Sequence, residues 1–502
     1  MKRTVVIVGG GLGGLFAGAM LAKEGIGVTV IEKNRTIGGG LQTFERFGEE
    51  FDTGMHVLGG MRKGGSVWRI CEYLGIADKL RLMDVSDTCS DKIYFAEDGS
   101  SYEVGSGEEG FVKTLAAYFP EEEANIRQYV EAIVGMAGKV DLFNLRPSSA
   151  QLSMMPTSDG FLKPADEYIA QFVKDARLRM LLAYKSPHYG GVGGKTPAYI
   201  HAIVSTLYIK GSTRFVGGSG QMATLLAGVI RENGGEVVAG DGVSHIEVED
   251  KTVREVRTES GNVYRADYYI SAIHPCTMFG LLSDKALPKS YRDRLNSIPN
   301  SISAFSLYIK MKAGAFPFMN YSEYYLAKGA DVWGFSGAGE WLRGFIMMTP
   351  PVEGQGTYSD TVVVVAPMAF ENVRQWEYTT VGRRGEEYLA WKRARVEELL
   401  GHIEEIHPRF REKVEAVEAS SPLTIRDYYG VKEGSMCGFS KDCNDMMQSQ
   451  VPVVTKVKNL LLTGQNSNLH GICGVPLTAI NTSEVILGQN YIINKINECT
   501  ES

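Results

Sequence analysis

The sequence lacks a long hydrophobic run, an excess of positive charge and a paired cysteine motif. Of its 502 residues, 52 are Lys or Arg and 59 are Asp or Glu, so the formal net charge is −7. A membrane-spanning helix needs about 20 apolar residues in a row, and the best candidates, 198–209 and 361–370, are about half that length. Because no basic block could neutralise a row of phosphates, we expect neither a bilayer span nor nucleic acid as a partner.

The seven cysteines include no Cys-x-x-Cys pair, which favours reduced thiols over a disulfide framework or a metal site. The first ten residues run directly into a strand-like segment and leave no room for a charged leader with a cleavage site. We therefore expect a cytoplasmic protein without a bound metal.

Glycine is what the chain has in abundance, with 58 residues gathered in doublets and triplets. Hydrophobic residues make up 44% and charged residues 22%, as in an ordinary globular protein, and the length predicts two or three domains. Glycine clusters outside a repeat indicate places where the backbone must approach another segment or a ligand closely.

A dinucleotide-binding unit is predicted at the start of the chain. Residues 4–8 form a β-branched apolar run typical of a buried parallel strand, which leads into Gly9-Gly10-Gly11-Leu12-Gly13-Gly14. The spacing Gly9-x-Gly11-x-x-Gly14 allows a tight turn, the approach of a pyrophosphate and close packing of helix on strand. The anion would lie at the amino end of a helix over 12–24, where free N–H groups favour negative charge.

The next strand, over 28–33, ends in Glu32 and Lys33. Glu32 lies 23 residues after Gly9, where a carboxylate can accept hydrogen bonds from ribose hydroxyls. A second cluster, Gly38-Gly39-Gly40 followed by Leu41, comes only six residues after Glu32 and resembles the extended fingerprint of FAD proteins. A flexible surface loop is the alternative reading of this cluster.

Two later stretches return to the same unit. Apolar periodicity and turn residues predict a helix over 219–233 and strands over 236–239, 243–248, 253–258 and 268–273. Near the carboxyl end, 459–462 forms a strand that turns at Gly464-Gln465-Asn466. The segment Gly471-Ile472-Cys473-Gly474-Val475-Pro476 opens a last helix that we expect to reach about residue 496, since proline fits near the start of a helix.

These motifs, with YKSPHYG at 184–190 and GGSG at 217–220, resemble the phytoene desaturase, carotenoid isomerase and retinol saturase superfamily of FAD-dependent oxidoreductases. The resemblance covers nearly the whole chain, and residues 38–60, 421–430 and 461–474 look closer to the retinol saturase and carotenoid isomerase branch than to bacterial phytoene desaturases. Two positions depart from the family pattern. Gly40 stands where the bacterial enzymes carry Arg, and Gln465-Asn466 replaces Gly-Asp, although asparagine can still hydrogen-bond ribityl hydroxyls.

The resemblance implies an α/β fold in which a Rossmann-like, GR2-type FAD-binding domain is interleaved with an α+β substrate domain built on an antiparallel sheet. The FAD-binding domain is expected over 1–70, 211–280 and 411–502, and the substrate domain over 71–210 and 281–410. It also implies that the backbone of Val243 meets the adenine. In the substrate domain, the sequence pattern predicts helices over 121–137, 166–184 and 384–406, and long strands over 303–312 and 361–368.

The implied activity is FAD-dependent chemistry on the C=C bonds of an apolar polyene or isoprenoid of carotenoid or retinoid type, by desaturation, saturation or cis–trans isomerisation. Hydride would move through flavin N5. Two alternatives stay open. Flavin amine oxidases share the fold, but their last motif reads differently from Thr463-Gly464-Gln465-Asn466. A non-enzymatic lipid-binding protein, similar to the Rab GDP-dissociation inhibitors, would have lost the flavin, against which the intact Gly9, Gly11, Gly14 and Glu32 argue.

Two histidines are candidates for delivering the proton that accompanies hydride transfer: His56 and His470. The alternative is that each hydrogen-bonds a loop carbonyl. Arg426 and Tyr428 are candidates for substrate contact, or for a structural ion pair beside tyrosines. Cys473 could have a low pKa near a helix start or simply pack, and the pairs 154–155 and 347–348 are methionines that could line a cavity or fill a core.

Contact with a membrane surface is expected from one predicted helix. Leu178, Met180, Leu181 and Leu182 alternate with Arg177, Arg179 and Lys185, a pattern suited to a helix that rests on anionic lipid at the inner face of a membrane. An apolar polyene would favour such a location, because each buried CH₂ prefers the membrane by about 0.8 kcal/mol. The alternative is that these leucines form the buried face of a lid helix.

Overall fold

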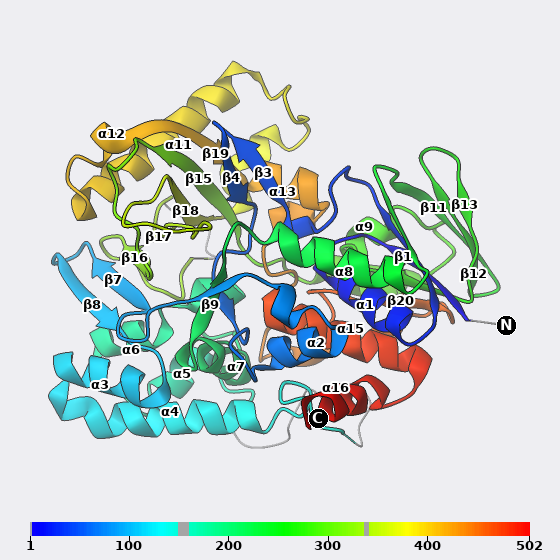
Figure 1. Cartoon of the computed structure of the whole chain (residues 1–502), viewed down its shortest axis with the longest axis horizontal. Coiled ribbons are helices and arrows are strands. Elements are labelled where there is room, and N and C mark those ends of the chain that lie inside the picture. Colours follow the sequence, from blue (N-terminus) through cyan, green and yellow to red (C-terminus); the bar gives the residue numbers. More distant parts are fainter. Residues whose placement is uncertain (1–2, 149–159, 336–340, 502) are drawn as a thin grey trace.

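The computed structural model describes residues 3–148, 160–335 and 341–501. It has a parallel sheet at one end and a larger, mainly antiparallel sheet at the other (Figure 1). Strands from three distant stretches of the chain build the parallel sheet, whose neighbouring strands are all parallel. In spatial order they are β10 (Glu236–Ala239), β2 (Gly27–Glu32), β1 (Thr4–Val8), β14 (Tyr268–Ser271) and β20 (Leu460–Leu462).

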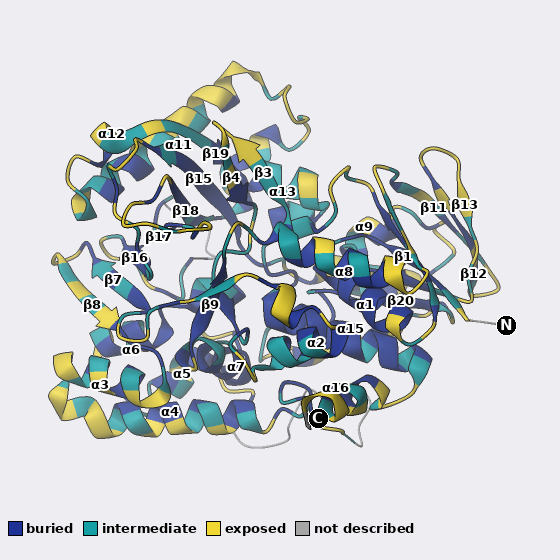
Figure 2. Cartoon of the chain, in the orientation of Figure 1, coloured by how far each residue is buried: buried dark blue, intermediate teal, exposed yellow. Residues whose placement is uncertain are grey.

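Alternate side chains of β1 enter two different cores. Val5 and Ile7 belong to the core formed with the helices α1 (Leu12–Lys23), α8 (Gly220–Glu232) and α15 (Gly471–Leu487). Val6 instead packs with the three-stranded sheet of β11 (Val243–Glu249), β12 (Thr252–Thr258) and β13 (Val263–Tyr264). Both faces of the parallel sheet are thus covered, as its near-continuous apolar strands predict, and α1 lies among the most buried elements of the molecule (Figure 2).

The second sheet has seven strands, and all its pairings are antiparallel except that of β16 with β7. The helix α11 (Gly385–Ile406) contributes to the core on one face of this sheet. In spatial order the strands are β19 (Val414–Ser420), β15 (Ser303–Met311), β18 (Thr361–Met368), β17 (Gly344–Met348), β16 (Ser322–Leu326), β7 (Asp91–Phe95) and β8 (Ser100–Val104).

The remaining elements surround these two sheets. Two small sheets are the hairpin of β3 (Thr43–Arg46) and β4 (Glu49–Asp52), and the set of β5 (Leu58–Gly59), β9 (Ser212–Phe215) and β6 (Leu82–Asp84). The helices are α2 (Ser66–Leu74), α3 (Glu108–Tyr118), α4 (Glu123–Gly138), α5 (Ala165–Ile169), α6 (Ala176–Ala183), α7 (Ala198–Ile209), α9 (Pro275–Phe279), α10 (Lys289–Ser297), α12 (Phe410–Lys413), α13 (Pro422–Tyr429), α14 (Met446–Ser449) and α16 (Tyr491–Glu501).

Two predicted helices are each divided in the structure. The last helix does not run to residue 496, because α15 ends at Leu487, and α16 begins at Tyr491 after a bend of 118°. Gly488 takes φ 115° and ψ 154°, which no helix contains. The predicted helix over 166–184 is α5 and α6, separated where the Asp175 side chain accepts the N–H of Leu178 and caps α6.

The pattern that predicted a lipid-facing helix belongs to α6, and its leucines face inward. Leu178, Leu181 and Leu182 lie in the main core, and Lys185 is only 6% exposed. This helix therefore gives no support to membrane contact. Within the described ranges no single helix is both long and apolar enough for a bilayer span, and only the bent pair α15 and α16 reaches that length and composition together.

The expected division into two domains stays a prediction. One strand of the expected FAD-binding stretch belongs to the other sheet. β19 follows the expected start of the last FAD-binding stretch at residue 411, yet it pairs with β15 in the seven-stranded sheet. The chain thus completes the second sheet before it returns, through α13, to the edge of the nucleotide-type unit.

Candidate functional site

The turn after β1 is built for a close ligand. Gly9 has φ 106°, and its N–H donates to the carbonyl of Ile31 at 2.8 Å. Gly11 precedes α1 and has no side chain to cap it, so the first N–H groups of the helix stay open to an anion. A Cβ on Gly14 would lie 2.0 Å from the carbonyl oxygen of Gly9, so only glycine allows this turn to close.

Glu32 stands at the carboxyl end of β2, facing this turn. Its Oε2 accepts the N–H of Gly10 at 2.8 Å, and its Oε1 accepts the N–H of Asn34 at 2.9 Å. These bonds fix the side chain, and each carboxylate oxygen keeps a further lone pair. The carboxylate can therefore accept ribose hydroxyls.

The second glycine cluster lies directly against the first. Gly38 has φ 117°, and its N–H donates to the carbonyl of Gly10 at 2.8 Å. A Cβ on Gly39 would lie 3.2 Å from the Cα of Gly11. This contact contradicts the flexible-loop reading, because the two clusters form one continuous backbone surface.

The third stretch closes the same surface from the other side. A Cβ on Gly13 would lie 3.0 Å from the Cα of Gly464. Asn466 is buried, and its Oδ1 accepts the N–H of Phe439 at 3.2 Å. α15 then begins at Gly471 with no acidic residue in its first turn, so its positive end is unneutralised there.

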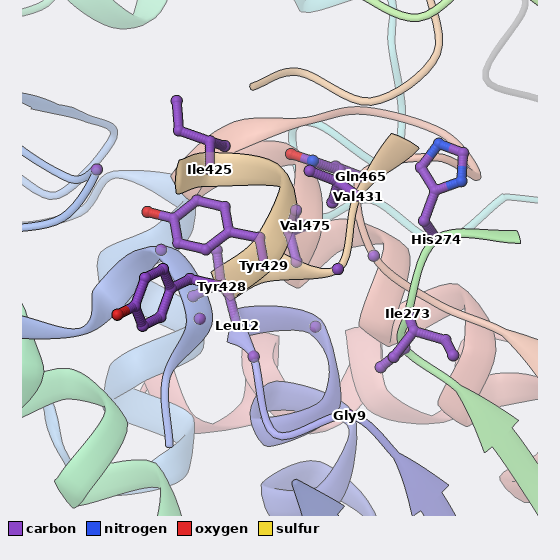
Figure 3. Close-up of a pocket in the computed structure, with 18 of the residues that line it drawn as sticks. Gly9, Leu12, Ile273, His274, Ile425, Tyr428, Tyr429, Val431, Gln465 and Val475 are labelled. Atoms are coloured by element: carbon purple, nitrogen blue, oxygen red, sulfur yellow. The ribbon is translucent and has the colours of Figure 1, made fainter. Parts of the chain in front are cut away.

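These three stretches line a first cavity of about 330 Å³. Ile425, Tyr428 and Tyr429 of α13 cover it, and Leu12, Val475 and Gln465 lie around it (Figure 3). Two of its lining residues, His56 and Thr463, carry a buried side-chain atom without a hydrogen-bond partner in the described structure. A bare glycine surface, an acid at the ribose position and free polar atoms together fit a flavin dinucleotide.

The predicted cofactor residues divide into two groups. Those that line the first cavity are Gly9, Gly11, Leu12, Gly13, Glu32, Lys33, Gly39, Gly40, Val243, Gly464, Gln465, Asn466 and Val475. Those that do not line it are Gly14, Gly38, Leu41, Gly474 and Pro476. The backbone of the second group packs against that of the first: the Cβ position of Gly14, for example, is 2.0 Å from the carbonyl oxygen of Gly9.

A second cavity of about 220 Å³ lies under the seven-stranded sheet. Its walls are largely apolar, with Leu326, Phe335, Phe345, Ile346, Met348, Val365 and Pro367 among them. It shares a wall with the first cavity, made of Gly54, Met55, His56, Val365, Met436, Gln465 and Gly471. An apolar molecule in the second cavity would therefore lie next to a group bound in the first.

The two candidate histidines lie in different places. His56 belongs to the shared wall, whereas His470 lines only the second cavity, at the N-cap of α15. Burial, with a smaller effect of Arg214, lowers the pKa of His56 to about 4, and burial with Lys441 lowers the pKa of His470 to about 4. Both imidazoles are thus neutral near pH 7, and neither offers an imidazolium proton there.

Arg426 lines neither cavity. Its guanidinium donates to Asp427 Oδ1 at 2.7 Å and to the carbonyls of Glu377 and Thr379, as a structural ion pair does. Tyr428 lines the first cavity and not the second. Substrate contact is therefore without geometric support at Arg426, and at Tyr428 the position is that of a cofactor neighbour.

The sulfur-containing candidates also have definite positions. Cys473 is 4% exposed, and burial raises the pKa of its thiol to about 11, so it remains protonated and inert. Met347 lies in the core of the second sheet and Met348 lines the second cavity. The pair at 154–155 lies outside the described residues.

Several lining residues had no assigned role in the sequence. Ile273 and His274 line the first cavity, and Tyr208 and Tyr324 line the second. Tyr208 begins the segment Tyr208-Ile209-Lys210-Gly211, which resembles a family motif, so a usable signal was present there. Tyr324 lies in no motif, and only its strand pairing places it at the cavity.

Comparison with known proteins gives a consistent result. A family model described as flavin containing amine oxidoreductase matches residues 12–487. The all-trans-retinol 13,14-reductase of Homo sapiens is 26% identical, over 97% of this chain and 86% of that protein. Prolycopene isomerase 2 of an Oncidium hybrid cultivar is 24% identical, over 86% and 74%. A 4,4'-diapophytoene desaturase of Methylomonas sp is 25% identical, over 61% of each chain.

Solved structures show the same fold at lower identity. An oxidoreductase from Methanosarcina mazei superposes with a TM-score of 0.65 at 16% identity, covering 96% of this chain and 100% of that one. A putrescine oxidase bound to putrescine gives a TM-score of 0.63 at 14% identity, covering 97% and 99%. These structures confirm the α/β fold. The match to the flavin family model and to the relatives above shows that the cofactor is FAD.

The glycine turn gives the first testable prediction. We expect Gly14→Ala to abolish tight flavin binding, because its Cβ must displace the carbonyl of Gly9. Gly228→Ala, within α8, is the matched control, since a Cβ there meets nothing within 4 Å. The measurement is the ratio of flavin to protein absorbance after purification, and Gly14→Ala protein that is as yellow as the control would contradict the prediction.

The buried histidines give a second prediction, about pH and stability. Burial lowers the pKa of five histidines from 6.5, to about 4 for His56, His274 and His470 and to about 3 for His188 and His201. The unfolded chain therefore binds more protons below pH 6.5, so stability is full above that pH and falls as the pH drops toward 4. We expect His56→Gln to make this fall shallower in urea titrations of the holoenzyme between pH 7 and pH 5.

The variant His245→Gln, on strand β11, is the matched control for this experiment. The His245 side chain is 39% exposed, so this variant removes an imidazole that is not buried. A slope changed as much as in His56→Gln would mean that burial is not the cause of the effect. An equal slope for His56→Gln and the parent would mean that His56 is not the buried, neutral group described above.

Proposed function

We propose that this chain, which belongs to the flavin-containing amine oxidoreductase family, is an FAD-dependent oxidoreductase that acts on C=C bonds of an apolar polyene of retinoid or carotenoid type. One observation carries the proposal: an apolar cavity shares a wall with the dinucleotide cavity. The relatives whose names mention a retinol, prolycopene and diapophytoene support the same substrate class.

The residues of the first cavity would hold FAD along its length. The amino end of α1 and the glycine turns would receive the pyrophosphate, and Glu32 the ribose. Gln465 and the start of α15 at Gly471, in the shared wall, would lie at the flavin end. Bound FAD supplies a two-electron hydride donor or acceptor.

The second cavity would orient the substrate and keep water away from it. Four residues in register cross the sheet from β16 to β15: Tyr324, Ile346, Val365 and Ser306. Tyr324 and Ile346 line the second cavity, Ser306 lines the first, and Val365 lines both. A flat, extended molecule that packs along this row would pass from the second cavity to the shared wall, where its double bond would be oriented and shielded from water.

We also propose a cytoplasmic location at the inner face of a membrane. The support is physical: an apolar polyene partitions into lipid, with about 0.8 kcal/mol for each buried CH₂. Because the leucines of α6 are buried, no helix is assigned to the contact with the membrane. Liposome flotation of the holoenzyme checks the proposal, and protein that stays with the soluble fraction would reject it.

The activity itself gives the third prediction. We expect the anaerobically reduced holoenzyme to be reoxidised by at least one member of a panel of all-trans-retinol, prolycopene and diapophytoene, with a matching change in the polyene spectrum. The apolar second cavity predicts that putrescine and benzylamine will not reduce the oxidised enzyme. Peroxide release from an amine would favour amine oxidation instead, and a colourless purified protein would favour the non-enzymatic alternative.

A further inference from the structure

A chain of buried polar side chains crosses the otherwise apolar surroundings of the second cavity. Lys185 Nζ lies 3.1 Å from Asp91 Oδ2 and 3.2 Å from the Tyr324 hydroxyl. The same hydroxyl lies 2.8 Å from His188 Nε2. The Tyr208 hydroxyl lies 3.5 Å from His188 Nδ1 and 3.4 Å from the carbonyl oxygen of Val57.

The donors and acceptors in this chain fit one direction. The Lys185 ammonium has only donors, so it donates to Asp91 and to the oxygen of Tyr324. Tyr324 then gives its single proton to His188 Nε2, which assigns the neutral imidazole proton to Nδ1. From Nδ1 the next group is Tyr208, whose own proton points to the Val57 carbonyl. Every hydrogen along the chain thus points from Lys185 toward Tyr208.

The Tyr208 end of this series of side chains lies near the wall between the two cavities. Val57 follows His56, which belongs to that wall, and Tyr208 itself lines the second cavity. The long, weak bond of the Tyr208 hydroxyl to Val57 is easily exchanged for a contact with a substrate. A double bond placed next to the first cavity would therefore have Tyr208 within reach.

We propose that Lys185, Tyr324, His188 and Tyr208 form a proton relay, and that Tyr208 gives the proton that saturates a C=C bond of the substrate. This inference rests on the proposed function. The π bond is replaced by two C–H bonds: one carbon receives a hydride, with its electron pair, from reduced FAD, and the other receives a proton from Tyr208. The flavin is oxidised by two electrons and the substrate is reduced by two.

The proton lost by Tyr208 is replaced along the relay. Tyr208 takes the Nδ1 proton of His188, His188 Nε2 takes the proton of Tyr324, and Tyr324 takes a proton from Lys185. Behind Lys185 lies a cavity of about 20 Å³ whose lining includes Ser90, Ser205 and Tyr208. A space of this size can hold one water, through which Lys185 would regain a proton from solvent.

Two buried cations, Lys185 and Arg214, face one buried carboxylate, Asp91. The Arg214 guanidinium donates to the carbonyls of Met319 and Thr349 and to Ser322 Oγ, and none of these partners is anionic. Burial raises the pKa of the Tyr208 hydroxyl, and Asp91, Cys437 and Cys473 add to this rise. A tyrosinate formed at Tyr208 is therefore a strong base, which would draw a proton from the relay at once.

The titratable groups that face the relay come from several elements. They are Asp91 of β7, Tyr184 and Lys185 after α6, His188, Tyr208 of α7, Arg214 of β9, Tyr324 of β16, Cys437, His470 and Cys473. Burial lowers the pKa of Lys185 although Asp91 opposes this effect. The ammonium is therefore a better proton donor than an exposed lysine.

Recognition of a polar head group would need free donors or acceptors at this place. Each of these polar side chains instead bonds another member of the same series. The Lys185 ammonium also lies 4.4–5.1 Å from the ring centroids of Tyr184, Tyr208 and Tyr324. A buried ion pair also adds little stability compared with apolar packing. Proton transfer requires directed hydrogen bonds, and the link between His188 Nδ1 and the Tyr208 hydroxyl, at 3.5 Å, is the one that must shorten.

The fourth prediction tests the relay with the reduced holoenzyme in anaerobic single turnovers. We expect Tyr208→Phe to slow flavin reoxidation by the polyene about 100- to 10,000-fold, while binding of the polyene, read from the absorbance change of oxidised flavin, stays within a few-fold. Tyr189→Phe is the matched control. It also removes a buried hydroxyl that bonds a histidine, His201 at 2.8 Å, but Tyr189 does not line the second cavity.

Lys185 acts through the other residues, and its test is a pH profile. In the parent enzyme the rate should fall as alkaline pH removes the Lys185 proton, at a pH below the ordinary 10.5 of lysine. The double variant Asp91→Asn/Lys185→Met removes both members of the ion pair, so neither charge of that pair is left alone. It should be slow and lose this alkaline fall. In D₂O, deuterium should enter the product of the parent enzyme at the carbon that receives the proton.

The outcomes separate the two proposals. Parent enzyme that no polyene reoxidises rejects the proposed function, and the relay with it. Parent enzyme that reacts, beside a Tyr208→Phe variant as fast as Tyr189→Phe, rejects the relay alone. An unchanged alkaline fall in the double variant rejects Lys185 as the proton source.

Discussion

The close approach of three backbone turns is the constraint on which the rest of the structure depends. The glycines at 9–14, 38–40 and 464 leave no room for side chains, since a Cβ on Gly13 or Gly39 would meet the backbone of the facing turn at 3.0–3.2 Å. The three turns must therefore be brought together from distant parts of the chain. The parallel sheet does this, because it places the carboxyl ends of β1, β2 and β20 at one edge.

The same constraint explains why the second cavity lies where it does. The segments between the three turns must leave and return to one edge of the parallel sheet, so the structure they form covers that edge. The row from Tyr324 to Ser306 crosses the seven-stranded sheet above it and joins the linings of both cavities. Two cavities with a common wall thus follow from the way the chain is interleaved.

The sequence alone was sufficient where the signal is local. The strand, glycine turn and helix over 4–24 were predicted to within one residue, because apolar periodicity and glycine spacing depend on neighbours in the chain. The break of the last helix was missed, since Gly488 leaves the helix where Glu484 accepts the N–H groups of Asn490 and Ile493, a contact that no periodicity shows. The amphipathic pattern around α6 left two readings open, a lipid-facing helix and the buried face of a lid helix, and the structure has its leucines buried.

Candidate site residues show the same distinction. Most of the cofactor residues come from motifs, and most of them line the first cavity. The polar chain of the second cavity joins Lys185 to partners 94 and 139 residues away, Asp91 and Tyr324, so only the folded sheet brings them together. YKSPHYG contains Lys185 and His188, but no sequence rule states what either residue contacts.

Burial sets the chemistry that these residues can perform. His56 and His470 were attractive as acids because histidine ordinarily titrates near neutral pH, yet the dryness that a polyene requires also removes their charge. A proton source in such a site must stay charged while buried, which requires a carboxylate partner and further hydrogen bonds. Lys185 has both, in Asp91 and Tyr324. Because a cavity for an apolar substrate is dry, the proposed relay draws its protons from an ion pair that lies behind the cavity.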